Sequence, residues 1–142
     1  MKTVLFLSLG CLAVAMPATA ANLAIDLDGV RNSPGTLYIS VQTREQFKQD
    51  RGVAGSVVKL ASAGSHRFAY EVPAGEYAIS VWHDDNGNGT FDKDGNYMPL
   101  DGWAMPNADK LRGEPTFDQI KTVVSNSPAT IPLSMVYGRN SK

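Results

Sequence analysis

The amino-acid sequence predicts an all-β protein, a single antiparallel β-sandwich of the immunoglobulin-like or transthyretin-like type with about seven strands and one long ordered loop. Three observations lead to this prediction. Short segments of alternating apolar and polar residues recur along the chain, as is typical of half-buried strands. Clusters of Gly, Pro, Asn and Asp separate these segments. Helical and strand-like segments do not alternate, which argues against a parallel α/β sheet.

The start of the chain predicts a secretory signal peptide at residues 1–20. Lys2 gives a positive start, residues 3–16 form an apolar run, and Ala18-Thr19-Ala20 is a small-residue cleavage site. The run is too short for a membrane span. We therefore expect cleavage after Ala20 and a periplasmic or secreted β-sandwich domain at residues 21–142.

The composition argues against several classes of partner. The chain carries 13 Lys and Arg against 14 Asp and Glu, a net charge of −1, which becomes −2 (12 − 14) once Lys2 is removed. No long basic block and no second long apolar run is present, so we expect no nucleic-acid partner and no membrane span. Cys11 is the one cysteine, and it leaves with the signal peptide. A lipoprotein anchor at Cys11 is the alternative, but Ser8-Leu9-Gly10 before it fits that use poorly. We expect a monomer whose partner is an unknown extracytoplasmic ligand or protein.

The strand pattern is clearest at residues 23–28, 37–42, 56–60, 67–72, 77–82 and 130–137. We expect the first two to form a hairpin across residues 29–35, where Pro34-Gly35 is the turn signal. Segment 56–60 is expected at a sheet edge, and Pro132 requires an edge or a bulge in the last strand. Thr43 to Gln46 resembles a helix start, with Phe47 as its anchor to the core. Residues 117–124 predict either a helical turn or a further short strand.

A metal-binding pattern follows the strand predicted for residues 77–82. Asp84, Asn86, Asn88, Gly89 and Asp92 form D-x-N-x-N-G-x-x-D, the first nine positions of a calcium loop of the EF-hand type. Alternate side-chain oxygens of such a loop turn toward one point, and glycine at the sixth position permits the sharp turn. We therefore predict a Ca²⁺ site in this loop.

The predicted calcium loop is incomplete. At its seventh position Thr90 would offer a backbone carbonyl, but the twelfth position is Gly95, where an EF-hand has a bidentate Glu. Asp94 and Asp101 are the candidates for the closing carboxylate. No helical pattern flanks the loop, so an EF-hand helix pair is not expected. The alternative is a metal-free turn, because Asn-Gly and Asp-Gly pairs are common in tight turns.

Residues 96–126 lose the strand periodicity. Proline and glycine interrupt them at Pro99, Gly102, Pro106, Gly113 and Pro115. A loop of this length in a compact domain is usually functional or disordered. The aromatic residues Tyr97, Trp103 and Phe117 favour order, because disordered segments rarely keep such residues together. We therefore expect an ordered excursion that packs over the calcium loop.

The segments PAGEYAISVWHD at 73–84, NGNG at 86–89 and MPLDGW at 98–103 resemble a family of small exported bacterial proteins, domain of unknown function 2141. The resemblance continues through residues 107–108, 113–117 and 131–137 and covers essentially the whole mature chain. It implies one exported β-sandwich with no established activity. This chain has Asp101 where Glu is usual, Pro106 where Ser is usual and Glu114 where Pro is usual. Asp in place of Glu keeps the carboxylate but shortens its reach. The Pro-x-Gly-x-Tyr entry is also similar to transthyretin-like sandwiches, a likeness of fold alone.

The sequence offers little support for catalysis. His66 and His83 are the two histidines, and without a mature cysteine they make a zinc site improbable. No Gly-x-Ser-x-Gly motif occurs. The clustered carboxylates stand beside Asn-Gly pairs and suit a cation better than proton transfer. We therefore predict a non-catalytic binding or structural module with a calcium-stabilised loop, and no enzyme.

Aromatic residues suggest a different function. Trp82, Tyr97 and Trp103 are candidate ligand-binding residues of a carbohydrate- or peptide-recognition module that uses loop 96–117, with metal absent or incidental. The simpler interpretation is that they pack the excursion onto the sheet, because large aromatic side chains more often bury than bind.

Overall fold

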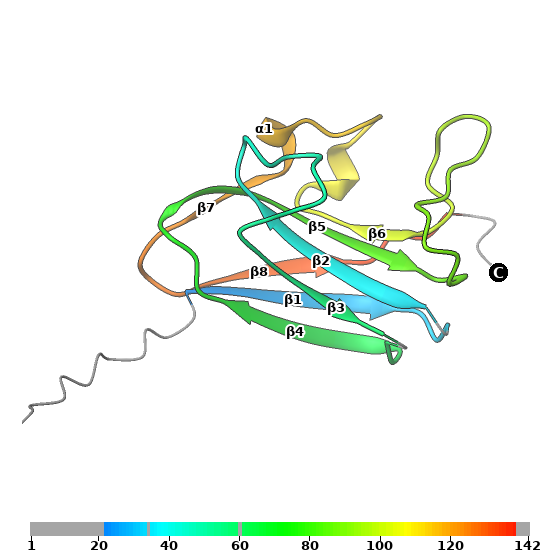
Figure 1. Ribbon diagram of the computed structural model, residues 1–142, viewed down its shortest axis with the longest axis horizontal. Coiled ribbons are helices and arrows are strands. Elements are labelled where there is room, and N and C mark those ends of the chain that lie inside the picture. The colour runs from blue at the N-terminus through cyan, green and yellow to red at the C-terminus, as the bar shows by residue number, and fades with distance from the viewer. Residues whose placement is uncertain (1–21, 34, 60, 139–142) are drawn as a thin grey trace, which may run out of the picture.

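A computed structural model describes residues 22–33, 35–59 and 61–138 of the chain. Two β-sheets pack face to face in these residues, which confirms the predicted sandwich (Figure 1). The described chain has eight strands, where about seven were expected. The predicted signal peptide, its cleavage site after Ala20 and Cys11 lie outside the described residues. No described helix is long and apolar enough to span a bilayer.

The smaller sheet is built around β1 (Leu23–Val30), which lies between β4 (Gly64–Tyr70) and β8 (Ala129–Ser134). β4 runs antiparallel to β1, whereas β8 runs parallel to it. This parallel pair is a local departure from the expected antiparallel arrangement. It arises because β8 follows a strand of the other sheet, so no hairpin fixes its direction relative to β1. Pro132 lies on β8 at the edge of this sheet, as predicted.

The larger sheet is built around the 10-residue strand β5 (Gly75–Asp84). β2 (Thr36–Gln42) pairs with one side of β5, and β3 (Ala54–Val58) lies beyond β2 at the edge, where an edge strand was predicted. β6 (Gly102–Ala104) and β7 (Lys121–Val124) share the other side of β5. All these pairs are antiparallel.

The prediction that the first two strands form a hairpin is wrong. β1 belongs to the smaller sheet and β2 to the larger one, so the connection crosses from one layer to the other. β2 begins beside the end of β5, with Thr36 opposite Asp84. A Cβ at Gly35 would overlap the backbone carbonyl of Asp84, so glycine permits this close approach. Alternation identified both strands but not their partners, because it reports burial and not pairing.

The main core lies between the two sheets and is formed by alternate residues of the strands. Its largest contributions come from Leu23, Ile25 and Leu27 of β1, Leu37, Ile39 and Val41 of β2, and Tyr77, Ile79 and Val81 of β5. The inward face predicted for β5 is therefore confirmed. Burial of these side chains fixes the register of β5 and hence the position of the loop that follows it.

A second apolar cluster covers the opposite face of β5. Ala78 packs there with Phe117 and Ile120 of the short helix α1 (Phe117–Ile120), and Phe47 packs against them. Residues 117–124 thus contain both the helical turn and the strand that were alternatives. Residues 43–50 form turns rather than a helix, although the Gln46 side chain does accept the Thr43 N–H at 3.2 Å. A 3₁₀ turn (Ala108–Lys110) interrupts the excursion between β6 and α1.

Candidate calcium loop and aromatic row

The candidate site begins where β5 leaves the sandwich. His83 and Asp84, the last two residues of β5, are both buried, and the chain then turns outward into a loop that projects from the end of the sheet (Figure 1). This loop returns to the sheet at Gly102, the first residue of β6. We call residues 84–101 the β5–β6 loop.

Asp84 organises the first turn of the β5–β6 loop. Its side chain is 3% exposed, and its Oδ1 and Oδ2 accept the backbone N–H groups of Asn88 at 3.1 Å and Gly89 at 2.9 Å. Gly87 and Gly89 have φ angles of 73° and 74°, a region that glycine adopts without strain. The sequence therefore folds here because a buried carboxylate gathers backbone donors and two glycines permit the reversals.

Asp92 gathers the two asparagine side chains. Its Oδ2 accepts from Asn86 Nδ2 and from Asn88 Nδ2, both at 2.7 Å. The amide oxygens close local turns, since Asn86 Oδ1 accepts the Asn88 N–H at 3.0 Å and Asn88 Oδ1 accepts the Thr90 N–H at 2.8 Å. Asp84, Asn86, Asn88 and Asp92 thus belong to one hydrogen-bonded network, and Thr90 adjoins it.

Asp101 supports this network through a hydrogen bond to the backbone of Asp92. It is 1% exposed, and its Oδ2 accepts the Trp82 Nε1–H at 2.8 Å and the Asp92 N–H at 3.1 Å. Burial raises the pKa of Asp101 above the usual aspartate range, although these two hydrogen bonds favour the carboxylate and oppose the shift. In this structure Asp101 holds the backbone of Asp92 in place.

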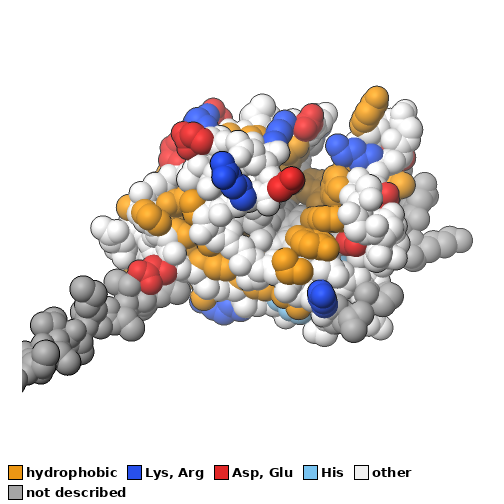
Figure 2. Space-filling view, viewed as in Figure 1, with side chains coloured by type: hydrophobic (Ala, Val, Ile, Leu, Met, Phe, Trp, Pro, Cys, Tyr) orange, Lys and Arg blue, Asp and Glu red, His pale blue; other side chains and the backbone are white. Residues whose placement is uncertain are grey.

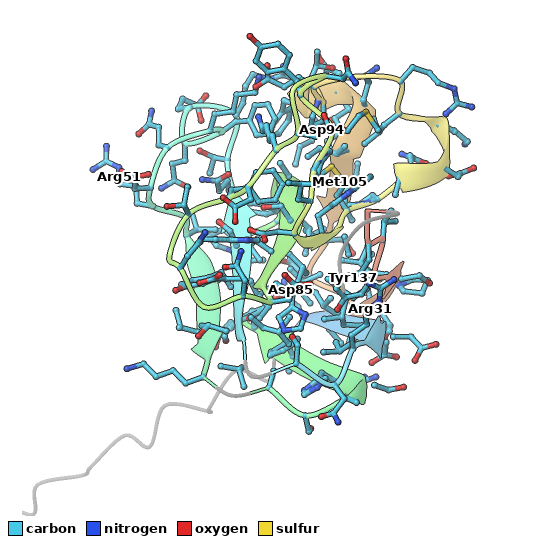
Figure 3. The ribbon with its side chains drawn as sticks, turned by 90° about the vertical axis from the view of Figure 1, so that its right-hand side faces the viewer. Arg31, Arg51, Asp85, Asp94, Met105 and Tyr137 are labelled. Carbon is cyan, nitrogen blue, oxygen red and sulfur yellow. The ribbon has the colours of Figure 1, made fainter. Side chains whose placement is uncertain are left out.

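Asp94 lies apart from the network. Its Oδ1 accepts the N–H groups of Asn96 at 2.8 Å and Met98 at 2.9 Å, and these bonds close a separate turn at the far end of the loop. Figure 3 shows Asp94 at the outer end of the loop, well away from Asp85, which follows directly after β5. Tyr97 occupies the same turn, with φ at 63° and 83% of its surface exposed. Asp94 and Tyr97 therefore form a distinct tip.

Of the seven predicted metal ligands, the structure brings the side chains of Asn86, Asn88 and Asp92 together directly. Asp84 joins this group through the backbone N–H of Asn88, and Thr90 lies beside it. Asp101 reaches the group through the backbone of Asp92, and Asp94 makes other contacts. In the part of the chain that the structure describes, no three His, Cys, Asp or Glu side chains group closely enough to hold a metal. An ion at this loop would have to use amide and carbonyl oxygens as well as the two carboxylates of Asp84 and Asp92.

A row of apolar residues crosses the outer face of the larger sheet. Register places Val57, Tyr38, Trp82, Trp103 and Val136 opposite one another in turn across the neighbouring segments. The Tyr38 and Trp82 rings stack with centroids 4.5 Å apart and an interplanar angle of 16°. Figure 2 shows apolar side chains gathered on this face beside the projecting loop. We call these five residues the aromatic row.

The aromatic row contains two of the three predicted ligand residues. Trp82 and Trp103 are cross-strand partners, whereas Tyr97 lies at the loop tip. Phe91 of the β5–β6 loop meets Trp82 edge-on, with centroids 6.0 Å apart. Tyr38 and Phe91 were missed by the sequence analysis. The alternation of β2 placed Tyr38 on an outer face, but its neighbour could not be known without the pairing of β2 with β5.

A buried histidine cluster lies beside the loop base and was also missed. His83 has its Nδ1 2.7 Å from Tyr137 Oη and its Nε2 3.3 Å from Ser33 Oγ. Tyr137 Oη accepts the Arg31 N–H at 3.0 Å, so its own hydrogen is available to His83 Nδ1, and the Nε2–H then faces Ser33. Burial lowers the pKa of His83, against the opposing effect of Asp85 nearby. In this tautomer His83 would donate to Ser33 Oγ, and the opposite tautomer would reverse the direction of both His83 hydrogen bonds.

The chain belongs to a bacterial family described as uncharacterized proteins conserved in bacteria (DUF2141), whose model matches residues 25–132. This match covers most of the sandwich, the whole β5–β6 loop and most of the aromatic row, and it confirms the resemblance found in the sequence. Comparisons with curated proteins and with solved structures give no match. The match therefore establishes the family of the chain but assigns it no activity.

Proposed function

We propose that this protein is an exported, non-catalytic binding or structural module whose β5–β6 loop is stabilised by Ca²⁺. The observation that carries the proposal is the convergence of Asp84, Asn86, Asn88 and Asp92 in one network at the end of β5. These are the residues that the calcium-loop spacing selects. Export rests on the signal-peptide pattern of residues 1–20.

The chemistry of the network suits a hard cation. Two amide groups lie 2.7 Å from one oxygen of Asp92, and they reach it through nitrogen. Rotation of each amide about its Cβ–Cγ bond would bring its oxygen toward the same carboxylate. Oxygens crowded in this way repel one another unless a cation lies among them. The loop could therefore exchange amide donors for Ca²⁺ with small movements.

The expected affinity is low. Asp84 and Asp92 are the two carboxylates of the network, and the remaining ligands are neutral. Calcium affinity rises with ligand charge and rigidity, and extracellular sites of this kind have dissociation constants of about 10⁻⁴–10⁻³ M. Such a site would be filled in a calcium-rich extracytoplasmic setting, where it would act as a structural clamp.

Thermal unfolding tests the proposal. The purified protein would be melted in EDTA, in excess Ca²⁺ and in excess Mg²⁺. At about 100 times the dissociation constant, binding adds about 2.7 kcal/mol to stability, which should raise Tm by several degrees. Equal Tm values in EDTA and Ca²⁺ would reject the site.

Variants locate the ion. Asp92→Ala and Asp84→Ala should abolish the calcium-dependent rise in Tm. Asp85→Ala is the matched control, because it removes an acidic residue adjacent to Asp84 for which no contact with Asn86, Asn88 or Asp92 is seen. Loss of the rise in all three variants would indicate a general charge effect instead of a bound ion.

The aromatic row supports a second candidate, recognition of a carbohydrate or peptide with metal incidental. A shallow groove of about 420 Å³ runs beside Tyr38, and its lining includes Ser40, Asp50, Gly55 and Val57. Tyr38 supplies the aromatic ring of this groove, and a ring beside hydroxyl and carboxylate groups is suited to such ligands. Titration with soluble oligosaccharides, followed by tryptophan emission, tests this candidate, with Tyr38→Ala as the variant that should lose the response. No response to the oligosaccharides would count against this candidate.

A further inference from the structure

The β5–β6 loop contains two Asn-Gly pairs, Asn86-Gly87 and Asn88-Gly89, and all four residues are exposed. Such pairs are chemically labile, because glycine has no side chain to hinder attack of its backbone nitrogen on the carbonyl carbon of the preceding asparagine side chain. In an unfolded chain the two pairs would react at similar rates. In the folded protein the hydrogen bonds around the two pairs differ, so their reaction rates should differ as well.

The two asparagine side chains are restrained alike. Each amide nitrogen donates to Asp92 Oδ2 at 2.7 Å. Each amide oxygen accepts the backbone N–H two residues ahead, at 3.0 Å for Asn86 and 2.8 Å for Asn88. The side chains therefore give no reason for one pair to react before the other.

The glycine nitrogens are restrained unequally. Gly89 N–H donates to the buried carboxylate of Asp84 at 2.9 Å, a charge-assisted bond that holds its nitrogen in place. Gly87 N–H faces the backbone carbonyl of Asp84 at 3.4 Å, which is a long and weak bond. The nitrogen of Gly87 is thus the one that can turn toward the asparagine before it.

We propose that Asn86 is a site of spontaneous deamidation, through which the β5–β6 loop acquires a further carboxylate. The Gly87 nitrogen bonds to Asn86 Cγ, the Cγ–Nδ2 bond breaks, and ammonia leaves with the proton from the Gly87 nitrogen. Water then opens the resulting succinimide at one of its two carbonyl carbons, which yields aspartate or isoaspartate at position 86. Water is the one co-reactant.

Conversion to aspartate would change what closes the loop. Asp92 Oδ2 would lose the hydrogen bond from Asn86 Nδ2 and would face a second carboxylate instead. Without a cation the two carboxylates repel each other, whereas a bound Ca²⁺ would gain a charged ligand. The reaction would therefore turn a loop that can close by hydrogen bonds into one that requires an ion. This step rests on the calcium site proposed above.

Peptide mapping by mass spectrometry tests the order of reaction. The folded protein and a synthetic peptide covering residues 82–95 would be incubated in separate, parallel samples at neutral pH in EDTA. Conversion at each asparagine would be followed over time in both samples. Asn86 should convert several-fold faster than Asn88 in the protein, while the peptide converts both at similar rates. Equal rates, faster reaction at Asn88, or no conversion at Asn86 after the peptide has reacted would each overturn the proposal.

Two variants check the cause. Asp84→Ala removes the acceptor of the Gly89 N–H, so Asn88 should then react at a rate closer to that of Asn86. Asn86→Gln should abolish the faster conversion, which assigns it to position 86 even if Asp84→Ala unfolds, and persistence of the faster conversion in Asn86→Gln would contradict the assignment. A slow Asn88 in folded Asp84→Ala would show that the Asp84 bond is not the cause.

Measurements with added Ca²⁺ distinguish failure of the deamidation proposal from failure of the proposed calcium site. Asn86→Asp reproduces one product and should show a larger calcium-dependent rise in Tm than the unchanged protein. Calcium should also slow conversion at Asn86. If calcium changes neither Tm nor rate, the calcium site fails, while faster conversion at Asn86 than at Asn88 would still establish the modification.

Discussion

Asp101 and Trp82 are joined by a hydrogen bond of 2.8 Å from the indole Nε1–H to Oδ2, and the same oxygen accepts the Asp92 N–H at 3.1 Å. Trp82 belongs to β5 and Asp92 to the β5–β6 loop, so one buried oxygen fixes the loop over the outer face of the sheet. Phe91 adds an edge-on contact to Trp82. The loop and the aromatic row are therefore one structural unit, and binding at one is expected to alter the other.

Asp101→Ala should destabilise the protein by about 2–4 kcal/mol, because it leaves the Trp82 and Asp92 donors without their acceptor in a largely buried place. Urea unfolding followed by tryptophan emission would measure the loss. Asp101→Asn is the control: it keeps an oxygen that can accept both bonds, so it should cost less. An equal loss in the two variants would show that the charge, and not the hydrogen bonds, is what matters.

The strands could be predicted from sequence because alternation reports burial directly. It located the segments around Leu23, Leu37, Tyr77 and Leu133. The edge position of the last strand followed from Pro132, because proline has no N–H to donate to a neighbouring strand. It could not assign the first two strands to different sheets, nor the parallel pair of β1 and β8, because pairing depends on long-range packing.

The candidate site was predictable to the extent that it is local. The spacing of Asp84, Asn86, Asn88 and Asp92 selects residues that one turn can bring together. Asp94 has the same chemistry but closes its own turn with Asn96 and Met98, which spacing alone does not reveal. The partners Tyr38 and Tyr137 come from segments distant in sequence, so no local pattern could have found them.

Gly102→Ala should destabilise the protein by about 1–3 kcal/mol through overpacking. A Cβ at Gly102 would overlap the ring of Tyr137, which also bonds to His83. The effect should be smaller in a Tyr137→Ala background, where the ring is absent, and a double-mutant cycle of unfolding free energies would measure this coupling. Gly113→Ala is the control, since nothing lies within 4 Å of its added Cβ. Additive losses would contradict the contact.

Asp118→Asn should alter the response to acid. Arg44 donates to both Asp118 oxygens, and with Lys121 it lowers the pKa of Asp118 to about 2. A depressed folded pKa stabilises the protein above the unfolded value near 3.8, and this contribution is lost as pH falls toward 2. The stability difference between the protein and Asp118→Asn should therefore shrink between about pH 4 and pH 2. A difference that stays constant over that range in urea unfolding would show that the ion pair contributes nothing.

Asp94→Ala should loosen the loop tip and leave the calcium response intact. Asp94 Oδ1 holds the N–H groups of Asn96 and Met98, so its removal should raise amide hydrogen exchange at those two positions. The network of Asp84, Asn86, Asn88 and Asp92 does not depend on these bonds, so any calcium-dependent rise in Tm should persist.

The matched variant for this test is Asp92→Ala, which should abolish the calcium response while leaving exchange at Asn96 and Met98 slow. The two variants together separate the tip from the network at its base. If Asp94→Ala removes the calcium response without unfolding the protein, then Asp94 closes the ion site after all. The tip would then have to fold back onto Asp92 when calcium binds, and exchange at Met98 should slow on addition of calcium.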